Sequence, residues 1–373
     1  MSESTHLKLE TVHFPDQFQG VFRRTKPRFQ PLLAEARAKL RALDVPATVR
    51  PYYEFAVLDR PQPAFMLLPI MYLATAEQHG GITERHKALL PSYMLAMELA
   101  AVVDDTVDRT PKRSNFLSYP ERFCEASAAS FSGFLVAKSL EMTAEVAPEV
   151  LPLAARLFQA VCATETWELY ARYPAVDDVS LRSWLHNRYH HVTPFIEHSF
   201  NMALRLNGRE EIGVDACRHF AEVAQDVDDV VNLVERRELI GENDDLKLGI
   251  VSSPLVETVA CEPDARDMLE AYWRPYRSIR IEHRQDFLEG MAQCSREHER
   301  EYADLAALVR ARGVPRTMDK IFLDVDASVD LSPAPLRETV RDVALSYLDR
   351  LRELDRRADI RWSDRPPPRA EAG

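Results

Sequence analysis

The sequence is poor in the residues that mark several common classes of protein. Glycine is scarce, with 11 among 373 residues, and no Asn-Gly or Asp-Gly pair lies between two alternating apolar segments, so β-hairpins are not indicated. The five cysteines are scattered and form no Cys-x-x-Cys pair, which gives no zinc motif and fits reduced thiols in a cytoplasmic protein.

Positive charge and long apolar runs are also lacking. The net charge is −12, which argues against a nucleic-acid partner because phosphate binding needs clustered Lys and Arg. No run of about 18 apolar residues exists, so no stable membrane insertion is expected. The opening MSESTHLKLETVHF has no apolar signal core, so export is not indicated.

Apolar residues recur at helical spacing almost throughout the chain and make up 46% of it, which predicts an all-α protein with a sizeable core. We expect helices over roughly 29–43, 63–79, 83–108, 120–144, 149–172, 180–206, 214–238, 252–261, 264–312 with a break, and 335–357. No internal boundary stands out, so residues 1–362 are expected to form a single domain. The segment 363–373, SDRPPPRAEAG, is Pro-rich and charged and is expected to be a disordered tail.

An apolar segment that ends in acids occupies residues 89–109, LLPSYMLAMELAAVVDDTVDR. Its apolar residues surround the expected helix on nearly all sides, which is typical of a buried helix. Asp104 and Asp108 lie one turn apart on one face, and Asp105 lies about 100° around the helix. Clustered carboxylates in such a helix are costly unless solvent or a cation neutralises them.

A second segment, QDVDDVVNLVERRE at 225–238, repeats this geometry with two aspartates and an asparagine. Oxygen ligands at this spacing suit Mg²⁺, which is commonly shared between carboxylates and substrate phosphates. Two such clusters on two helices could face each other and hold a diphosphate through bridging metal ions. We therefore predict a site for about three Mg²⁺ ions, with the ligands Asp104, Asp105, Asp108, Asp228, Asp229 and Asn232.

Chance is the alternative explanation for either motif alone. The chain has 59 acidic residues, so a single DDxxD on a solvated helix end needs no function. Two motifs with the same spacing, each after an apolar helical segment, favour a shared site instead.

Both clusters resemble the motifs of trans-isoprenyl diphosphate synthases. DDTVDRTPKR, from residue 104, is similar to the first aspartate-rich motif, DDxxDxxxxRRG. Arg113 falls on its first arginine and Ser114 replaces the second. QDVDDVVNL is similar to the second motif, with Gln225 three positions before Asp228.

Two further segments support the resemblance. DDLKLGIVSSPLV (244–256) resembles the family's DLxxGKxSxP segment, and TETWELYAR (164–172) resembles its GQxxDL segment. The resemblance implies a single-domain, class I terpenoid synthase-like helical bundle around a central cavity. It also implies Mg²⁺ dependence and an allylic prenyl diphosphate as substrate, and it makes a homodimer a candidate assembly, since helical dimers are common in this family.

The chain departs from the family where lysines hold the second diphosphate. The family's Gly-Lys-Arg near the N-terminus corresponds to VLDRPQPAF (57–65), in which Arg60 alone remains. The Lys-Thr pair of the middle helix falls on His191 and Val192, and Ile250 stands at the position of another lysine. A chain-elongating enzyme holds two diphosphates, so these losses weaken that reading.

Class I terpene synthases share this fold and need only one diphosphate. Their second motif, (N/D)Dxx(S/T)xxxE, is met only in part, because Arg236 stands at the position of the glutamate. We interpret the chain as a class I terpene cyclase, a lyase that ionises a linear allylic diphosphate and cyclises the resulting cation. The alternatives are a chain-elongating prenyltransferase, which Gln225 favours, and a non-catalytic partner subunit of one.

Arginine pairs its planar fork with phosphate oxygens, so cationic residues near the motifs are candidates for binding the diphosphate. Arg188 lies close to where the terpene synthases carry a diphosphate-sensing arginine. The other candidates are Arg113, Arg236, Arg237 and Lys247. For each of them alone, a surface salt bridge is the alternative.

Aromatic faces stabilise cations, and Phe195 and Trp167 are expected to line the cavity because their helices align with cavity-lining helices of the resembling family. Gln225 is expected beside them. Leu99 and Ala100, about one turn before Asp104, replace the bulky aromatic residues that shorten the pocket in that family. Their small size suggests room for a chain of about C20 or longer.

Overall fold

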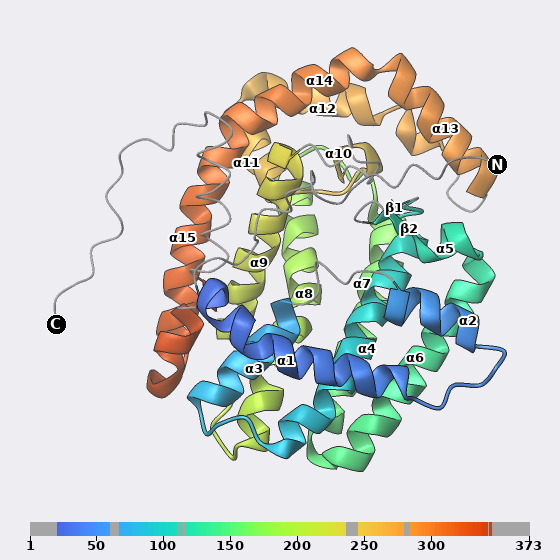
Figure 1. Cartoon of the computed structure of the whole chain (residues 1–373). Coiled ribbons are helices and arrows are strands. Elements are labelled where there is room, and N and C mark those ends of the chain that lie inside the picture. Colours follow the sequence, from blue (N-terminus) through green and yellow to red (C-terminus); the bar gives the residue numbers. More distant parts are fainter. Residues whose placement is uncertain are drawn as a thin grey trace.

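Helices make up almost all of the protein (Figure 1). The computed structural model describes residues 21–59, 67–110, 112–113, 116–235, 245–279, 284–341 and 343–344. In this part of the chain the α-helices are α1 (Val21–Arg41), α2 (Arg50–Tyr53), α3 (Leu67–Gln78), α4 (Glu84–Val107), α5 (Tyr119–Arg122), α6 (Glu125–Val146), α7 (Leu151–Ala171), α8 (Asp178–Leu206), α9 (Val214–Glu235), α10 (Asp245–Leu248), α11 (Ser253–Cys261), α12 (Pro263–Trp273), α13 (Arg284–Glu297), α14 (Glu299–Leu308) and α15 (Val314–Leu331). Two π-helical segments, η1 (Glu54–Asp59) and η5 (Val309–Gly313), follow α2 and α14.

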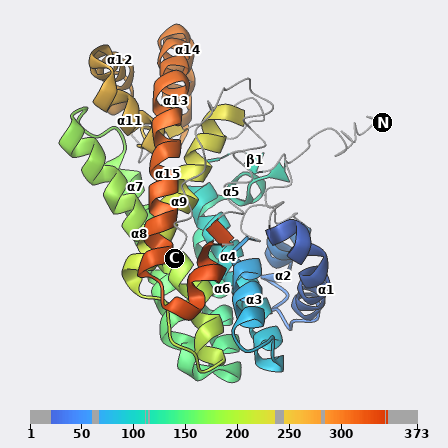
Figure 2. The ribbon, with the colours of Figure 1, turned by 90° about the vertical axis from the view of Figure 1, so that its left-hand side faces the viewer.

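The long helices α4, α6, α7, α8 and α9 form the body of the bundle. Helix α4 packs on α6 and α7, α8 packs between α7 and α9, and α15 runs along α9 (Figures 1 and 2). Helix α4 lies innermost because its sequence is apolar on nearly every side, and nearly all of it from Leu89 to Val102 is buried. Helices α10 to α14 cover the upper end of the bundle in Figure 1, where the short strands also lie.

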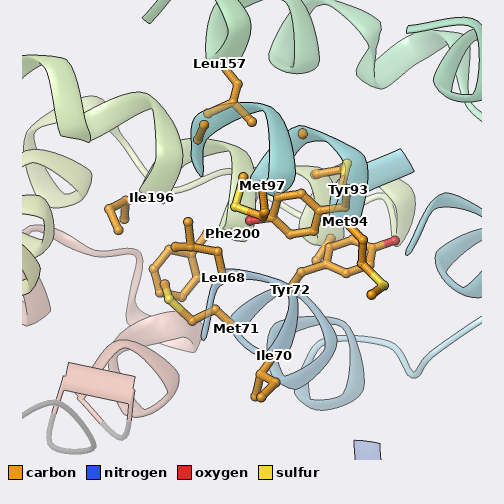
Figure 3. Close-up of a cluster of buried hydrophobic side chains, with 14 of the residues drawn as sticks. Leu68, Ile70, Met71, Tyr72, Tyr93, Met94, Met97, Leu157, Ile196 and Phe200 are labelled. Carbon is orange, nitrogen blue, oxygen red and sulfur yellow. The ribbon is translucent and has the colours of Figure 1, made fainter. Parts of the chain in front are cut away.

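The interior between α3, α4 and α8 is filled by large apolar and aromatic side chains (Figure 3). Tyr72 and Tyr93 are fully buried there, so their hydroxyls need partners. The Tyr72 hydroxyl donates to the carbonyl oxygen of His86 at 3.1 Å, and the Tyr93 hydroxyl bonds with that of Ser199. These bonds join the helices at fixed positions in a core that is otherwise held by apolar contact.

The all-α fold predicted from the sequence is confirmed, and the structure corrects it in detail. The expected helix over 264–312 is three helices, and the first break follows Trp273 near Pro275, because proline cannot continue the helical bonding. A short antiparallel pair, β1 (Lys112–Arg113) and β2 (Phe116–Leu117), was not expected, since two-residue strands carry no alternating pattern.

Several expectations of organisation stay predictions. The single-domain boundary at 362 and the tail 363–373 lie outside the described residues. The central cavity implied by the resemblance also stays a prediction. None of the described helices is both long and apolar enough to span a bilayer.

Helices α11 and α15 meet through the segment η5, and Gly313 allows this close approach. A Cβ built on Gly313 would overlap the carbonyl oxygen of Pro254 and the hydroxyl of Thr258. Because the carbonyl belongs to the backbone of α11, it cannot move aside as the end of a side chain could. Glycine is therefore needed at this position for packing.

We expect Gly313→Ala to lower the free energy of unfolding by about 1–3 kcal/mol, because the added methyl group overpacks the junction. Gly133→Ala is the matched control, since no atom of the described residues would lie within 4 Å of its Cβ on the exposed side of α6. That control should gain about 0.5–1 kcal/mol through helix propensity. Urea unfolding followed by circular dichroism measures both changes, and equal effects of the two substitutions would contradict the packing argument.

Candidate active site

The first acidic cluster lies at the C-terminal end of α4, close to where the β1–β2 pair begins (Figure 1). Asp105 is fully buried, whereas Asp104 and Asp108 are partly buried. Asp108 follows the last residue of α4 and caps it, and its carboxylate accepts a hydrogen bond from the guanidinium of Arg172. The residue after α7 thus holds the end of α4.

The second acidic cluster lies on α9, and Asp229 is its most strongly held member. Its Oδ1 accepts hydrogen bonds from Arg188 Nη1 and Gln225 Nε2, both at 3.0 Å. Its Oδ2 accepts from the backbone amide of Ser253, at the start of α11, at 2.9 Å. Asp229 therefore ties α9 to α8 and α11, and Gln225 helps to orient it.

The other two predicted ligands on α9 lie one turn apart and contact each other. Asn232 Nδ2 donates to Asp228 Oδ2 at 3.4 Å. The amide oxygen of Asn232 is buried and has no hydrogen-bond partner among the described residues. A buried acceptor oxygen beside a carboxylate is costly by itself and suits a hard cation, so these residues fit Mg²⁺.

Arg188 lies between the two clusters. Its guanidinium contacts carboxylates at 3.0 Å on Asp229, 3.5 Å on Glu168 and 3.7 Å on Asp245, and its side chain is 11% exposed. Burial raises the carboxyl pKa of Asp108 on α4, and the charges of Arg172 and Arg188 oppose that rise. Contacts therefore link Asp108 of α4 to Arg172 at the end of α7, and Glu168 of α7 through Arg188 to Asp229 of α9.

Burial dominates the electrostatics of this space. It raises the pKa of the carboxyl groups of Asp108, Glu168 and Asp229, and the two guanidiniums of Arg172 and Arg188 oppose that shift for Asp108 and Glu168. The repulsion between carboxylates acts in the same direction as burial, since Asp108 and Asp229 both raise the pKa of Glu168. Among the described residues around Arg188 the carboxylates outnumber the guanidiniums, so an added cation would be stabilised there.

Two other predicted site residues, Lys247 and Trp167, lie against aromatic rings. Lys247 Nζ lies 4.5 Å from the ring centroid of Tyr302 on α14. The Trp167 ring is tilted against that of Trp184, with 4.7 Å between the ring centroids, and Trp167 lines a pocket on the outer side of α7. That location favours a surface role for Trp167, and its expected role in a cavity stays a prediction.

Of the remaining predicted site residues, some are buried or partly buried, and the side chains of the others lie outside the described residues. Leu99 and Ala100 are buried on α4, and Phe195 is partly buried against the core. Arg113 belongs to β1, but its side chain lies outside the described residues, as do Arg236 and Arg237. Their assignment to diphosphate binding stays a prediction.

Two residues at the site, Glu168 and Arg172, were not among those predicted from the sequence. Both lie in TETWELYAR, which matched the GQxxDL segment without a role being assigned to its charged residues. They are four positions apart, so both face the same side at the end of α7. The spacing of four residues between Glu168 and Arg172 was the signal available in the sequence. It does not show that Arg172 contacts Asp108.

The sequence as a whole matches a family model described as polyprenyl synthetase over residues 66–287, which is more than half of the chain. No curated protein sequence matches the chain. The resemblance to trans-isoprenyl diphosphate synthases inferred from the two acidic motifs is thereby confirmed.

The fold is similar to those of several solved structures. A decaprenyl diphosphate synthase from Rhodobacter capsulatus is 16% identical, with a TM-score of 0.64 over 88% of this chain and 98% of that one. A polyprenyl synthetase from Streptomyces coelicolor A3(2) is 18% identical, with a TM-score of 0.66 over 87% and 98%. A heptaprenyl diphosphate synthase from Staphylococcus aureus is 14% identical, with a TM-score of 0.62 over 87% and 97%.

The interpretation of the chain as a terpene cyclase, and hence as a lyase, is wrong. The matching family model is that of polyprenyl synthetases, and it supports the chain-elongating alternative, a prenyltransferase. The absence of the family's lysines does not remove a substrate site, because positive charge can be supplied from other positions in the fold. The chain belongs to the polyprenyl synthetase family.

Proposed function

We propose that the protein is a Mg²⁺-dependent prenyltransferase that lengthens an allylic prenyl diphosphate with isopentenyl diphosphate. The observation that carries this proposal is the set of contacts at this end of the bundle: Arg172 at the end of α7 binds Asp108 of α4, and Arg188 binds Glu168 of α7 and Asp229 of α9. A surplus of buried carboxylates beside a buried arginine suits a magnesium diphosphate, in which the metal contacts the acids and the arginine contacts the phosphate.

The reaction breaks the allylic C–O bond, and the diphosphate leaves with the electron pair. The double bond of the acceptor then attacks the allylic carbon, a new C–C bond forms, and a proton is lost. Asp104, Asp108, Asp228 and Asn232 would hold Mg²⁺, which neutralises charge on the diphosphate when bound. Arg188 stabilises the negative charge that develops on the leaving group, which is the type of interaction that contributes most to many enzymes.

The acceptor is assigned on the strength of the family. His191 stands where the resembling enzymes carry a lysine, and its ring lies 5.4 Å from that of Trp167. Arg60, the remaining residue of the N-terminal cationic segment, lies outside the described residues. A different acceptor is therefore one outcome that an assay should detect.

A reducing compartment is the location that we propose. The described cysteines are all free, and Cys124 and Cys162 are exposed. Exposed thiols persist in compartments that keep them reduced, such as the cytoplasm.

We further propose a homodimer that pairs through the outer face of α7. The Tyr170 side chain is 73% exposed on this face. It borders the pocket that also contains Trp167 and is lined mainly by neutral side chains of one helix: Gln159, Cys162, Ala163, Thr166, Trp167, Tyr170 and Ala171. An aromatic residue beside an apolar hollow is suited to a contact between two copies.

Incubation with Mg²⁺, isopentenyl diphosphate and allylic diphosphates of C10, C15 or C20 should give products longer by multiples of five carbons. Asp104→Ala should slow product formation by about 100-fold or more, because a charge-stabilising group of the site is lost. Asp326→Asn, an exposed acid on α15, is the matched control. Chromatography of the dephosphorylated products measures chain length. Absence of any lengthened product with the wild-type chain would contradict the proposed function.

Mg²⁺ together with inorganic diphosphate should stabilise the wild-type protein, by about 2.7 kcal/mol at one hundred times the dissociation constant. Asp228→Asn should be at least as stable as the wild type without ligand, because one clustered charge is removed. The same variant should lose most of the gain from the ligands. Thermal unfolding with and without Mg²⁺ and diphosphate provides the measurement, and an undiminished gain in the variant would exclude Asp228 as a ligand.

Tyr170→Asp should convert the dimer to a monomer, because a carboxylate would be buried at the contact. Leu323→Asp, at a residue of α15 that is 70% exposed, is the matched control and should leave the assembly unchanged. Light scattering after size exclusion gives both masses. A monomeric wild type, or a dimeric Tyr170 variant, would show that α7 is not the interface.

A further inference from the structure

We infer that Arg172 binds the diphosphate group of the substrate directly, in addition to holding Asp108. The inference deepens the proposed function, because it concerns the same site. Neither the acidic motifs nor the candidate arginines named from the sequence include this residue.

The contacts of Arg172 leave part of its guanidinium unused. Its Nη2 donates to the carboxylate of Asp108 and lies 3.5 Å from the carbonyl oxygen of Val107. Its Nε and Nη1 are buried and have no hydrogen-bond partner within the described part of the chain, and the side chain is 3% exposed. An arginine stays charged, so buried N–H donors without acceptors are costly. They indicate an acceptor that arrives with a ligand.

The surroundings of Arg172 select the kind of ligand. Arg172 acts electrostatically on Glu168 as well as on Asp108, and both carboxylates are also under the influence of Arg188. An anion that enters this space meets many carboxylates and therefore needs metal ions to accompany it. A diphosphate bound to Mg²⁺ meets that requirement, and its oxygens match the planar fork of a guanidinium.

A rigid turn fixes the position of Arg172. Tyr173 adopts a left-handed backbone conformation, with φ of 53°, and its amide donates to the carbonyl oxygen of Gly249 at 2.9 Å. The Tyr173 ring occupies the space that a side chain at Gly249 would need, and its hydroxyl donates to the carbonyl oxygen of Lys247 at 2.6 Å. A residue held by a turn that costs backbone strain is typical of a preorganised site.

The outer side of the same turn offers a control. Arg277 donates to the carbonyl oxygens of Tyr173 and Pro174, at 3.1 and 2.8 Å, and it is partly exposed. Replacing Arg277 by lysine loosens the turn and keeps the charge. It leaves the unused donors of Arg172 in place, so it separates support of the turn from contact with the ligand.

The test is calorimetric binding of inorganic diphosphate at saturating Mg²⁺. Arg172→Lys keeps a positive charge but loses the fork, and it should weaken binding by about 10- to 100-fold, as expected for lost hydrogen bonds to a charged group. Arg172→Gln should weaken it at least as much. Arg277→Lys should change it by no more than about twofold, as for an exposed substitution. Thermal unfolding without ligand confirms that each variant folds, and Arg172→Lys remains informative if Arg172→Gln does not.

Each outcome decides the inference. An Arg172→Lys variant that binds diphosphate with wild-type affinity would overturn the inference. Equal losses of affinity in Arg172→Lys and Arg277→Lys would also overturn it, because they would show that Arg172 serves only to support the turn. Absence of diphosphate binding by the wild type would also overturn it. If the wild type binds diphosphate, Arg172→Lys weakens binding and no prenyl chain is lengthened, the inference stands and the proposed function fails.

Discussion

The buried guanidinium of Arg188 is the interaction on which the arrangement of the active-site end depends. It reaches carboxylates on three other elements, Glu168 on α7, Asp229 on α9 and Asp245 on α10. A buried charge is destabilising unless it is paired. Removing one partner of a buried ion pair is strongly destabilising, because the other charge then stays buried without a partner. The need to pair this one charge therefore fixes α7, α9 and α10 around α8.

The acidic residues of α9 have different roles: some hold the helix to its neighbours, and others are predicted metal ligands. Asp226 is fully buried and accepts hydrogen bonds from Tyr189 and from Lys320 of α15, the latter at 3.0 Å. Asp229, almost one turn later, accepts from α8 and α11. These two aspartates thus hold one side of α9 against α8, α11 and α15. Asp228 and Asn232 lie on a different face of the same helix and contact each other.

Much of the fold and part of the site could be predicted from the sequence. Apolar spacing predicted the helices, and the spacing of Asp104, Asp105 and Asp108 predicted that these acids lie together at the end of one helix, as they do at the end of α4. The anchoring of Asp229 by the amide of Ser253 could not be predicted, because it depends on where α11 begins in space. The contact of Arg172 with Asp108 could not be predicted for the same reason. Such unpredicted positive charge explains why the inference of a cyclase was wrong. The positions at which the family's lysines are missing do not determine the total charge of the site, because an arginine at the end of another helix can supply positive charge.

The central claim is that α4 and α9 together bind one metal-bound diphosphate, with arginines on its free oxygens. The most direct measurement is a crystal structure with Mn²⁺ and inorganic diphosphate, in which anomalous scattering locates the metal. We expect Mn²⁺ at the carboxylates of Asp104 or Asp108, and at the carboxylate of Asp228 and the amide oxygen of Asn232, with the diphosphate within hydrogen-bond distance of Arg172 and Arg188. Metal at only one of the two helices, or diphosphate bound away from both arginines, would contradict it.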